Sequence, residues 1–86
     1  MRTDALVESR SMLLSAHSAP SLHLHPCCSI NSYRNLEYFY DHARIEHLFF
    51  DGATTPVDGV LYPDLARPGM GLEFKRADAA PYQVPI

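Results

Sequence analysis

The sequence predicts an α/β fold in which short parallel strands alternate with helices and an irregular tail follows. The apolar run Met12–Leu14 continues into Ser15, Ala16 and His17, which is typical of a buried parallel strand that ends in a polar residue. A second run, residues 36–40, is apolar and aromatic and predicts another strand. Segments with helix signals lie around both runs.

Helix signals lie before the first predicted strand and, more strongly, between the two predicted strands. Residues 4–10 contain no Gly or Pro and are expected to form the end of a helix. After the first strand, Ser18 is expected to cap a new helix with its side-chain oxygen, and Pro20 suits the first turn of that helix. Pro26 lies further inside, where a proline costs about 3 kcal/mol. We therefore expect the integrity of this helix to be compromised at Pro26.

The second half of the chain has a shorter helix and then many breakers. Residues 31–35 predict a turn-rich connection, and residues 41–50 place apolar side chains at the spacing of one or two helical turns. From Asp51 onward, Gly and Pro interrupt short apolar pieces, so turns and short strands are expected. Lys75 and Arg76 are expected at the solvated end of such a strand.

Composition excludes several classes of function. The net charge of −3 and the scattered Lys and Arg residues give no basic patch for nucleic acid. No apolar run approaches the roughly 20 residues of a membrane helix. Asp4 and Glu8 interrupt any signal-peptide core, so a cytoplasmic location is expected. Cys27 and Cys28 are adjacent and are expected to be reduced and buried.

The tail carries a series of residues that match a known family in order. They are Phe50, Asp51, Gly52, Asp58, Gly59, Pro63, Asp64, Arg67, Pro68, Gly69, Gly71 and Leu72. With these residues the chain resembles the C-terminal part of the enolase superfamily, in its mandelate racemase and muconate lactonizing branch, which includes acid-sugar dehydratases. Upstream, residues 14–17 resemble the end of the seventh barrel strand and residues 36–39 resemble the eighth.

This resemblance implies a partial (β/α)8 barrel. Residues 1–50 would supply the end of the sixth helix and the last two βα units, and residues 51–86 would form an irregular tail that packs on a capping domain. A complete barrel needs about 250 residues, whereas this chain has 86. The sequence is therefore interpreted as a C-terminal fragment.

The resemblance also implies two catalytic residues, His17 and Glu37, at the C-terminal ends of neighbouring strands, where barrel enzymes place their sites. The implied reaction is proton abstraction next to the carboxylate of a small sugar acid, with His17 as general acid or base. Glu37 would face the substrate carboxylate. The plainer alternatives are a strand-end histidine that makes one backbone hydrogen bond and a strand-end carboxylate that faces solvent.

Magnesium assists this chemistry in the family. The resemblance places its carboxylate ligands on the third to fifth strands, and the Asp that orients the histidine on the sixth. Neither set is in this sequence, so we expect no cofactor in the fragment and no catalysis by the chain alone. The alternative function is a non-catalytic fragment whose exposed strand edges drive self-association or complementation of another chain.

Other candidate sites have weaker support. His23, His25 and the cysteine pair suggest zinc, but their spacing does not match the separated ligand pairs of structural zinc sites. His42 and His47 are expected to be surface or helix-end residues. The glycines in residues 67–71 are expected to form a turn and not a phosphate loop, because no Lys-Ser or Lys-Thr follows them.

Overall fold

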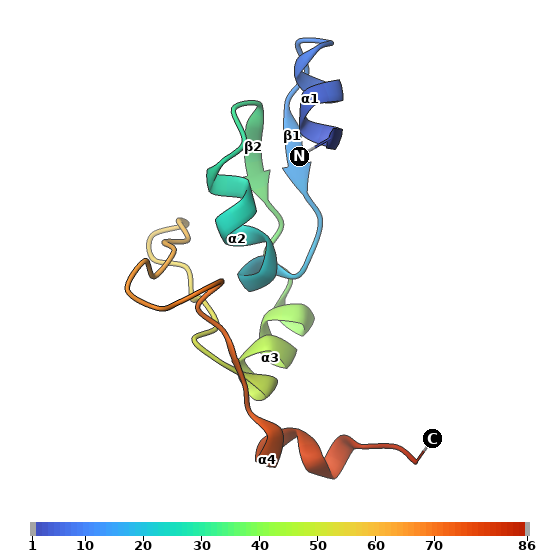
Figure 1. Cartoon of the computed structure of the whole chain (residues 1–86), viewed down its shortest axis with the longest axis vertical. Helices are drawn as coiled ribbons and strands as arrows, with labels where there is room; N and C mark the ends of the chain where they lie inside the picture. Colours follow the sequence, from blue (N-terminus) through green and yellow to red (C-terminus); the bar gives the residue numbers. More distant parts are fainter. Residues whose placement is uncertain (1, 86) are drawn as a thin grey trace.

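The computed structural model describes residues 2–85 and confirms an α/β mixture (Figure 1). Its elements are α1 (Arg2–Glu8), β1 (Leu14–Ala16), α2 (Pro20–Cys28), β2 (Tyr33–Leu36), α3 (Tyr40–Phe49), β3 (Phe50–Asp51), β4 (Glu73–Phe74), α4 (Arg76–Ala79) and the 3-10 turn η1 (Ala80–Tyr82). Strands β1 and β2 pair in parallel and are connected through α2. This strand–helix–strand unit is the part of the fold that positions the candidate site.

The second strand lies earlier in the sequence than predicted. Leu14 pairs with Tyr33 and Ala16 with Leu36, so β2 covers residues 33–36 and not 36–40. The aromatic residues that predicted a strand instead lead into α3, which begins at Tyr40 and runs for 10 residues. The reason is that pairing with β1, and not local β propensity, determines where β2 begins and ends.

Helix α2 differs from prediction at both ends. Its first turn has Pro20 as expected, but the preceding residue is Ala19 and no side chain from that position caps it, so the predicted cap by Ser18 is wrong. The expected disruption at Pro26 is also wrong, because α2 continues to Cys28. Pro26 lies in the last turn, so it removes a single bond near the helix end, and its carbonyl accepts from the amide and hydroxyl of Ser29 at 3.1 and 2.7 Å.

A glutamate from a different helix performs the capping. The amide of Ser21, in the first turn of α2, donates to Glu46 Oε1 and Oε2 of α3 at 3.2 and 3.0 Å. Ser21 Oγ in turn accepts from the Thr54 amide at 2.9 Å. Glu46 and Ser21 are both buried. A buried carboxylate at the positive end of a helix therefore connects α2, α3 and the tail.

A second buried polar contact attaches α1 to the strands. Ser32 Oγ donates to Asp4 Oδ1, both residues are buried, and the Ser32 carbonyl accepts from the Leu14 amide at 2.8 Å. Asp4 therefore has a structural partner at the start of β2.

The tail has the predicted turns and short strands, together with a helix that was not predicted. Strands β3 and β4 pair in an antiparallel manner, and Val57 and Val60 form an isolated bridge. The prediction for Lys75 and Arg76 is wrong, because β4 ends at Phe74, Lys75 is the N-terminal cap position of α4 and Arg76 is the first residue of α4. The Lys75 ammonium pairs with Asp78 at 3.6 Å, which favours the helical turn.

The described chain is extended, with α1 and β1 at one end and α4 at the other (Figure 1). Its radius of gyration is 14.9 Å, whereas a compact domain of this length has roughly 12 Å. Apolar side chains near the β1 end remain in solvent: Leu6 is 70% and Leu13 63% exposed. Residues 2–85 contain no helix with the length and apolar character to cross a membrane.

Candidate active site

The candidate site lies where the two parallel strands end. His17 directly follows β1 and Glu37 directly follows β2. Ala16 and Leu36 are register partners, and the Glu37 amide donates to the Ala16 carbonyl at 3.0 Å. The expectation that both side chains lie at the same end of adjacent parallel strands is therefore confirmed. Their catalytic roles stay a prediction.

The two side chains are in direct contact. His17 Nδ1 lies 2.6 Å from Glu37 Oε2. The His17 side chain is 82% exposed and that of Glu37 is 42% exposed, so water screens the pair and its contribution to stability is small. The contact instead determines orientation, because an ionised carboxylate only accepts hydrogen bonds and Nδ1 must then carry a proton.

Four further residues lie around His17. The edge of the Phe39 ring approaches the imidazole, with centroids 5.9 Å apart and planes at 75°, and the Phe39 ring lies 5.9 Å from that of His42. A hollow of about 310 Å³ is lined by His17, Ser18, Phe39, Asp41 and His42. Sequence reasoning did not place Asp41 and His42 beside the site. Their position a few residues after Glu37, beyond the C-terminal end of the second strand, was the signal that could have indicated it.

The zinc interpretation gains no support from the positions of its residues. Cys27 is buried but Cys28 is exposed, which corrects the expectation that both are buried. Burial raises the pKa of the Cys27 thiol, which disfavours the thiolate that binds metal. His23 Nδ1 is 2.8 Å from the Ser18 carbonyl. Within residues 2–85, no three His, Cys, Asp or Glu side chains are grouped so that they could hold a metal ion.

The lack of a grouped set of possible metal ligands within residues 2–85 also bears on magnesium. This ion prefers octahedral oxygen coordination and is usually bound through carboxylates, and the described part of the chain brings no such group together. The residues present therefore do not fit a magnesium site on their own.

The fold was compared with solved structures. It matches a mandelate racemase/muconate lactonizing enzyme-like protein from Rubrobacter xylanophilus with a TM-score of 0.88 and 48% sequence identity over 93% of this chain. The predicted family resemblance is confirmed. The chain spans 22% of that protein, consistent with a C-terminal piece of a mandelate racemase-like protein. No protein-family model and no curated protein matches the chain.

The mandelate racemase-like tail motif has a packing role. Arg67 Nη2 donates to Asp51 Oδ2 at 3.0 Å. A Cβ on Gly52 would lie 2.0 Å from the Gly71 carbonyl oxygen and 2.9 Å from Arg67 Nε. The Gly71 amide donates to the Pro68 carbonyl at 3.1 Å, so the glycine-containing segment is a turn, as predicted. These contacts hold the start of the tail, at Asp51 and Gly52, against residues 67–71.

The Asp51–Arg67 pair gives a prediction about pH. Hydrogen bonding and charge from Arg67 lower the pKa of Asp51 below 3.8. A lowered carboxyl pKa contributes stability that is complete above the ordinary pKa and is lost as the pH falls through the lowered pKa. In Arg67→Gln, we expect the Asp51 pKa to rise toward 3.8, measured by NMR titration of its carboxyl carbon.

A second variant serves as the control for this titration. The charge of Lys75 also lowers the pKa of Asp51, but it is the smallest of the contributions. Lys75→Gln should therefore raise the Asp51 pKa less than Arg67→Gln. An equal rise in both variants would contradict the assignment to Arg67.

Proposed function

We propose that this chain is the C-terminal piece of a magnesium-dependent sugar-acid dehydratase or racemase, and that it is inactive alone. The observation that carries the proposal is the contact of His17 with Glu37 at one edge of two parallel strands, in a chain 48% identical to a mandelate racemase-like protein. We retain the cytoplasmic location, which the two free cysteines support.

In this proposal His17 moves the proton. Its imidazole takes a proton from the carbon next to the substrate carboxylate, a role that histidine side chains commonly have in enzymes. In a dehydratase, the electron pair left on that carbon forms a double bond to the next carbon, whose hydroxyl leaves with a proton from an acid. In a racemase, a proton returns to the same carbon from the opposite side.

The geometry of the isolated chain explains why it would be inactive. Charge that develops in a transition state is stabilised best by fixed dipoles in a site that excludes water. Here the imidazole is mostly in solvent, and residues 2–85 assemble no metal-binding group. Walls, metal ligands and substrate contacts would have to come from residues outside this 86-residue segment.

The test is complementation. The chain is mixed with the Rubrobacter protein truncated to remove its matching segment, and a panel of sugar acids is incubated with the mixture, magnesium and D2O. We expect deuterium exchange or dehydration next to the carboxylate only in the mixture. His17→Asn should reduce the rate about 100-fold or more. His47→Asn, which lies near Thr54 and outside the site, should leave the rate unchanged.

Two results would overturn this function. One is a stable complex in which His17→Asn is as active as the unchanged chain. The other is a stable complex that neither exchanges nor dehydrates any sugar acid in the panel.

A second candidate function is non-catalytic complementation of another chain. The exposed apolar side chains Leu6, Met12 and Leu13 lie on or beside α1 and β1, and the described sheet contains only β1 and β2. An unpaired strand edge beside apolar side chains favours association. Size-exclusion chromatography with light scattering distinguishes the outcomes: a complex with the truncated protein supports complementation, whereas a homo-oligomer that excludes it supports self-association.

A further inference from the structure

We propose that residues 17–20 form a strained elbow that aims His17 at the rim of the strand pair, and that His23 is the positioning residue that holds this elbow. The catalytic consequence rests on the proposed function, but the geometry of the elbow does not. Ser18 has φ +56°, and Ala19 has φ +44° and ψ +57°. Both residues therefore lie in the left-handed region, which is unfavourable for a residue with a Cβ.

The choice of residues makes this turn stiff as well as strained. Within residues 2–85, Ser18 and Ala19 are the only consecutive residues with positive φ of which neither is a glycine, since Asp58 is followed by Gly59. Glycine would adopt this conformation without steric cost, but it would also sample many others. Strained non-glycine residues cluster at functional sites, where the surrounding structure holds them in place.

The elbow lies where the chain reverses direction. Strand β1 ends at Ala16 and α2 begins at Pro20, and the chain turns back between them (Figure 1). His17 is the residue just before the bend, and its side chain is 82% exposed. The nucleophile elbow of α/β-hydrolases presents its side chain on a sharp, strained strand-to-helix turn of the same kind.

Several contacts hold the elbow in its left-handed conformation. His23 Nδ1 lies 2.8 Å from the Ser18 carbonyl, and a carbonyl can only accept, so Nδ1 is the donor. The Ala19 carbonyl accepts from the amides of Leu22 and His23, both at 3.1 Å. Ser18 and Pro20 are buried. The His23 side chain is therefore the part of α2 that reaches back to the strained peptide next to His17.

The strain is tested by Ala19→Gly. Glycine lacks the Cβ that disfavours this conformation, so the urea midpoint of unfolding should be unchanged or higher, despite the flexibility of glycine. Ala5→Gly is the matched control, because Ala5 is exposed within the helix α1 and glycine should lower the midpoint there. An equal fall of the midpoint in both variants would overturn the strain.

The positioning is tested by the motion of the His17 ring, followed by ¹³C relaxation in the full chain with labelled histidine rings. The order parameter of His17 should fall in His23→Leu and in Ala19→Gly. His23→Asn should restore most of it, because the Asn side chain can donate from about the place of Nδ1. The ring of His47, whose Nε2 lies 3.1 Å from the Thr54 carbonyl, is the reference and should not change.

Two results would overturn the role of His23. One is an unchanged order parameter of His17 in His23→Leu, and the other is an equal loss in His23→Leu and His23→Asn. Unchanged hydrogen exchange of the Ser21 amide, which Glu46 caps, shows that the start of α2 is still folded. If His23→Leu unfolds that start, the order parameter of His17 in Ala19→Gly decides the proposal.

The catalytic consequence is measured in the complementation assay. His23→Leu and Ala19→Gly should each lower kcat about tenfold or more and leave KM nearly unchanged, because a misaligned base slows the chemical step. A mobile His17 with an unchanged kcat would overturn the positioning role. An inactive complex of the unchanged chain would overturn the proposed function alone, because the urea midpoints and the ring motion do not depend on catalysis.

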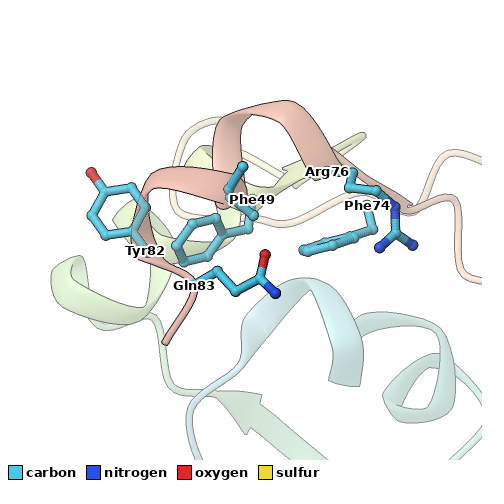
Figure 2. Close-up of a pocket in the computed structure, with 7 residues that line it drawn as sticks. Phe49, Phe74, Arg76, Tyr82 and Gln83 are labelled. Atoms are coloured by element: carbon cyan, nitrogen blue, oxygen red, sulfur yellow. The ribbon is translucent and has the colours of Figure 1, made fainter. Parts of the chain in front are cut away.

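Pocket residues at the far end of the molecule carry no second proposal. Phe49, Phe74, Arg76, Tyr82 and Gln83 line an apolar hollow of about 510 Å³ (Figure 2). Phe49 packs edge-on against Tyr82 with centroids 5.4 Å apart, and the Arg76 guanidinium lies 5.6 Å from the Phe74 ring centre. These contacts hold α4 and η1 against the end of α3, and nothing in the structure shows what would cover the hollow.

Discussion

Gly52→Ala is expected to destabilise the chain by roughly 3 kcal/mol, because it combines backbone strain with a steric clash. Gly52 has φ +88°, and a left-handed backbone costs a non-glycine residue roughly 1–2 kcal/mol. The added Cβ would lie 2.0 Å from the Gly71 carbonyl oxygen, and overpacking adds about 1–3 kcal/mol. The measurement is the free energy of unfolding from urea denaturation followed by circular dichroism.

Gly59→Ala is the matched control for this substitution. Gly59 has a similar φ of +76°, but no atom lies within 4 Å of its added Cβ. The free energy of unfolding of Gly59→Ala should therefore fall only by the cost of the strained backbone, roughly 1–2 kcal/mol. If both variants lost the same stability, the clash with the tail would not be the cause.

Glu46→Leu is expected to cost about 1–3 kcal/mol, because the buried Ser21 amide loses its acceptor at the start of α2. The expected signs are a lower free energy of unfolding and faster hydrogen exchange of the Ser21 amide. Glu46→Gln should lose less stability, since the side-chain oxygen of Gln can still accept from the Ser21 backbone amide.

The exposed Glu8 provides the control. Its substitution in Glu8→Ala removes a carboxylate without a buried partner and should change stability by less than about 0.5 kcal/mol. Unchanged exchange of the Ser21 amide in Glu46→Leu would show that Glu46 does not cap α2.

The differences between prediction and structure have identifiable causes. Residues 36–40 have strand-like side chains, yet β2 lies at 33–36 because Leu36 is the partner of Ala16. Ser18 is a suitable capping residue, yet Glu46, 25 residues beyond Ser21, supplies the acceptor. Lys75 and Arg76 were predicted at a strand end, yet they begin α4. For β2 and the start of α2, a partner distant in sequence outweighed a local preference, whereas at Lys75 the pair with Asp78, three residues on, favours the helical turn.

The candidate site was predictable in part. A polar residue at the end of each strand placed His17 and Glu37 at one edge, because parallel strands present their C-terminal ends together. Their direct contact was not predictable, since it depends on the register between segments 20 residues apart. The approach of Phe39 to the imidazole likewise follows from where α3 begins.

By itself, the sequence determined the family resemblance, the alternation of strands and helices, the turns of the tail and the two residues of the candidate site. These features depend on residue type and on order along the chain, which are local properties. Only the tertiary structure decided the ends of β2, the capping of α2 by Glu46, and the bonding of Glu37 to His17. These depend on distances between segments far apart in the chain, which backbone pairing and packing establish.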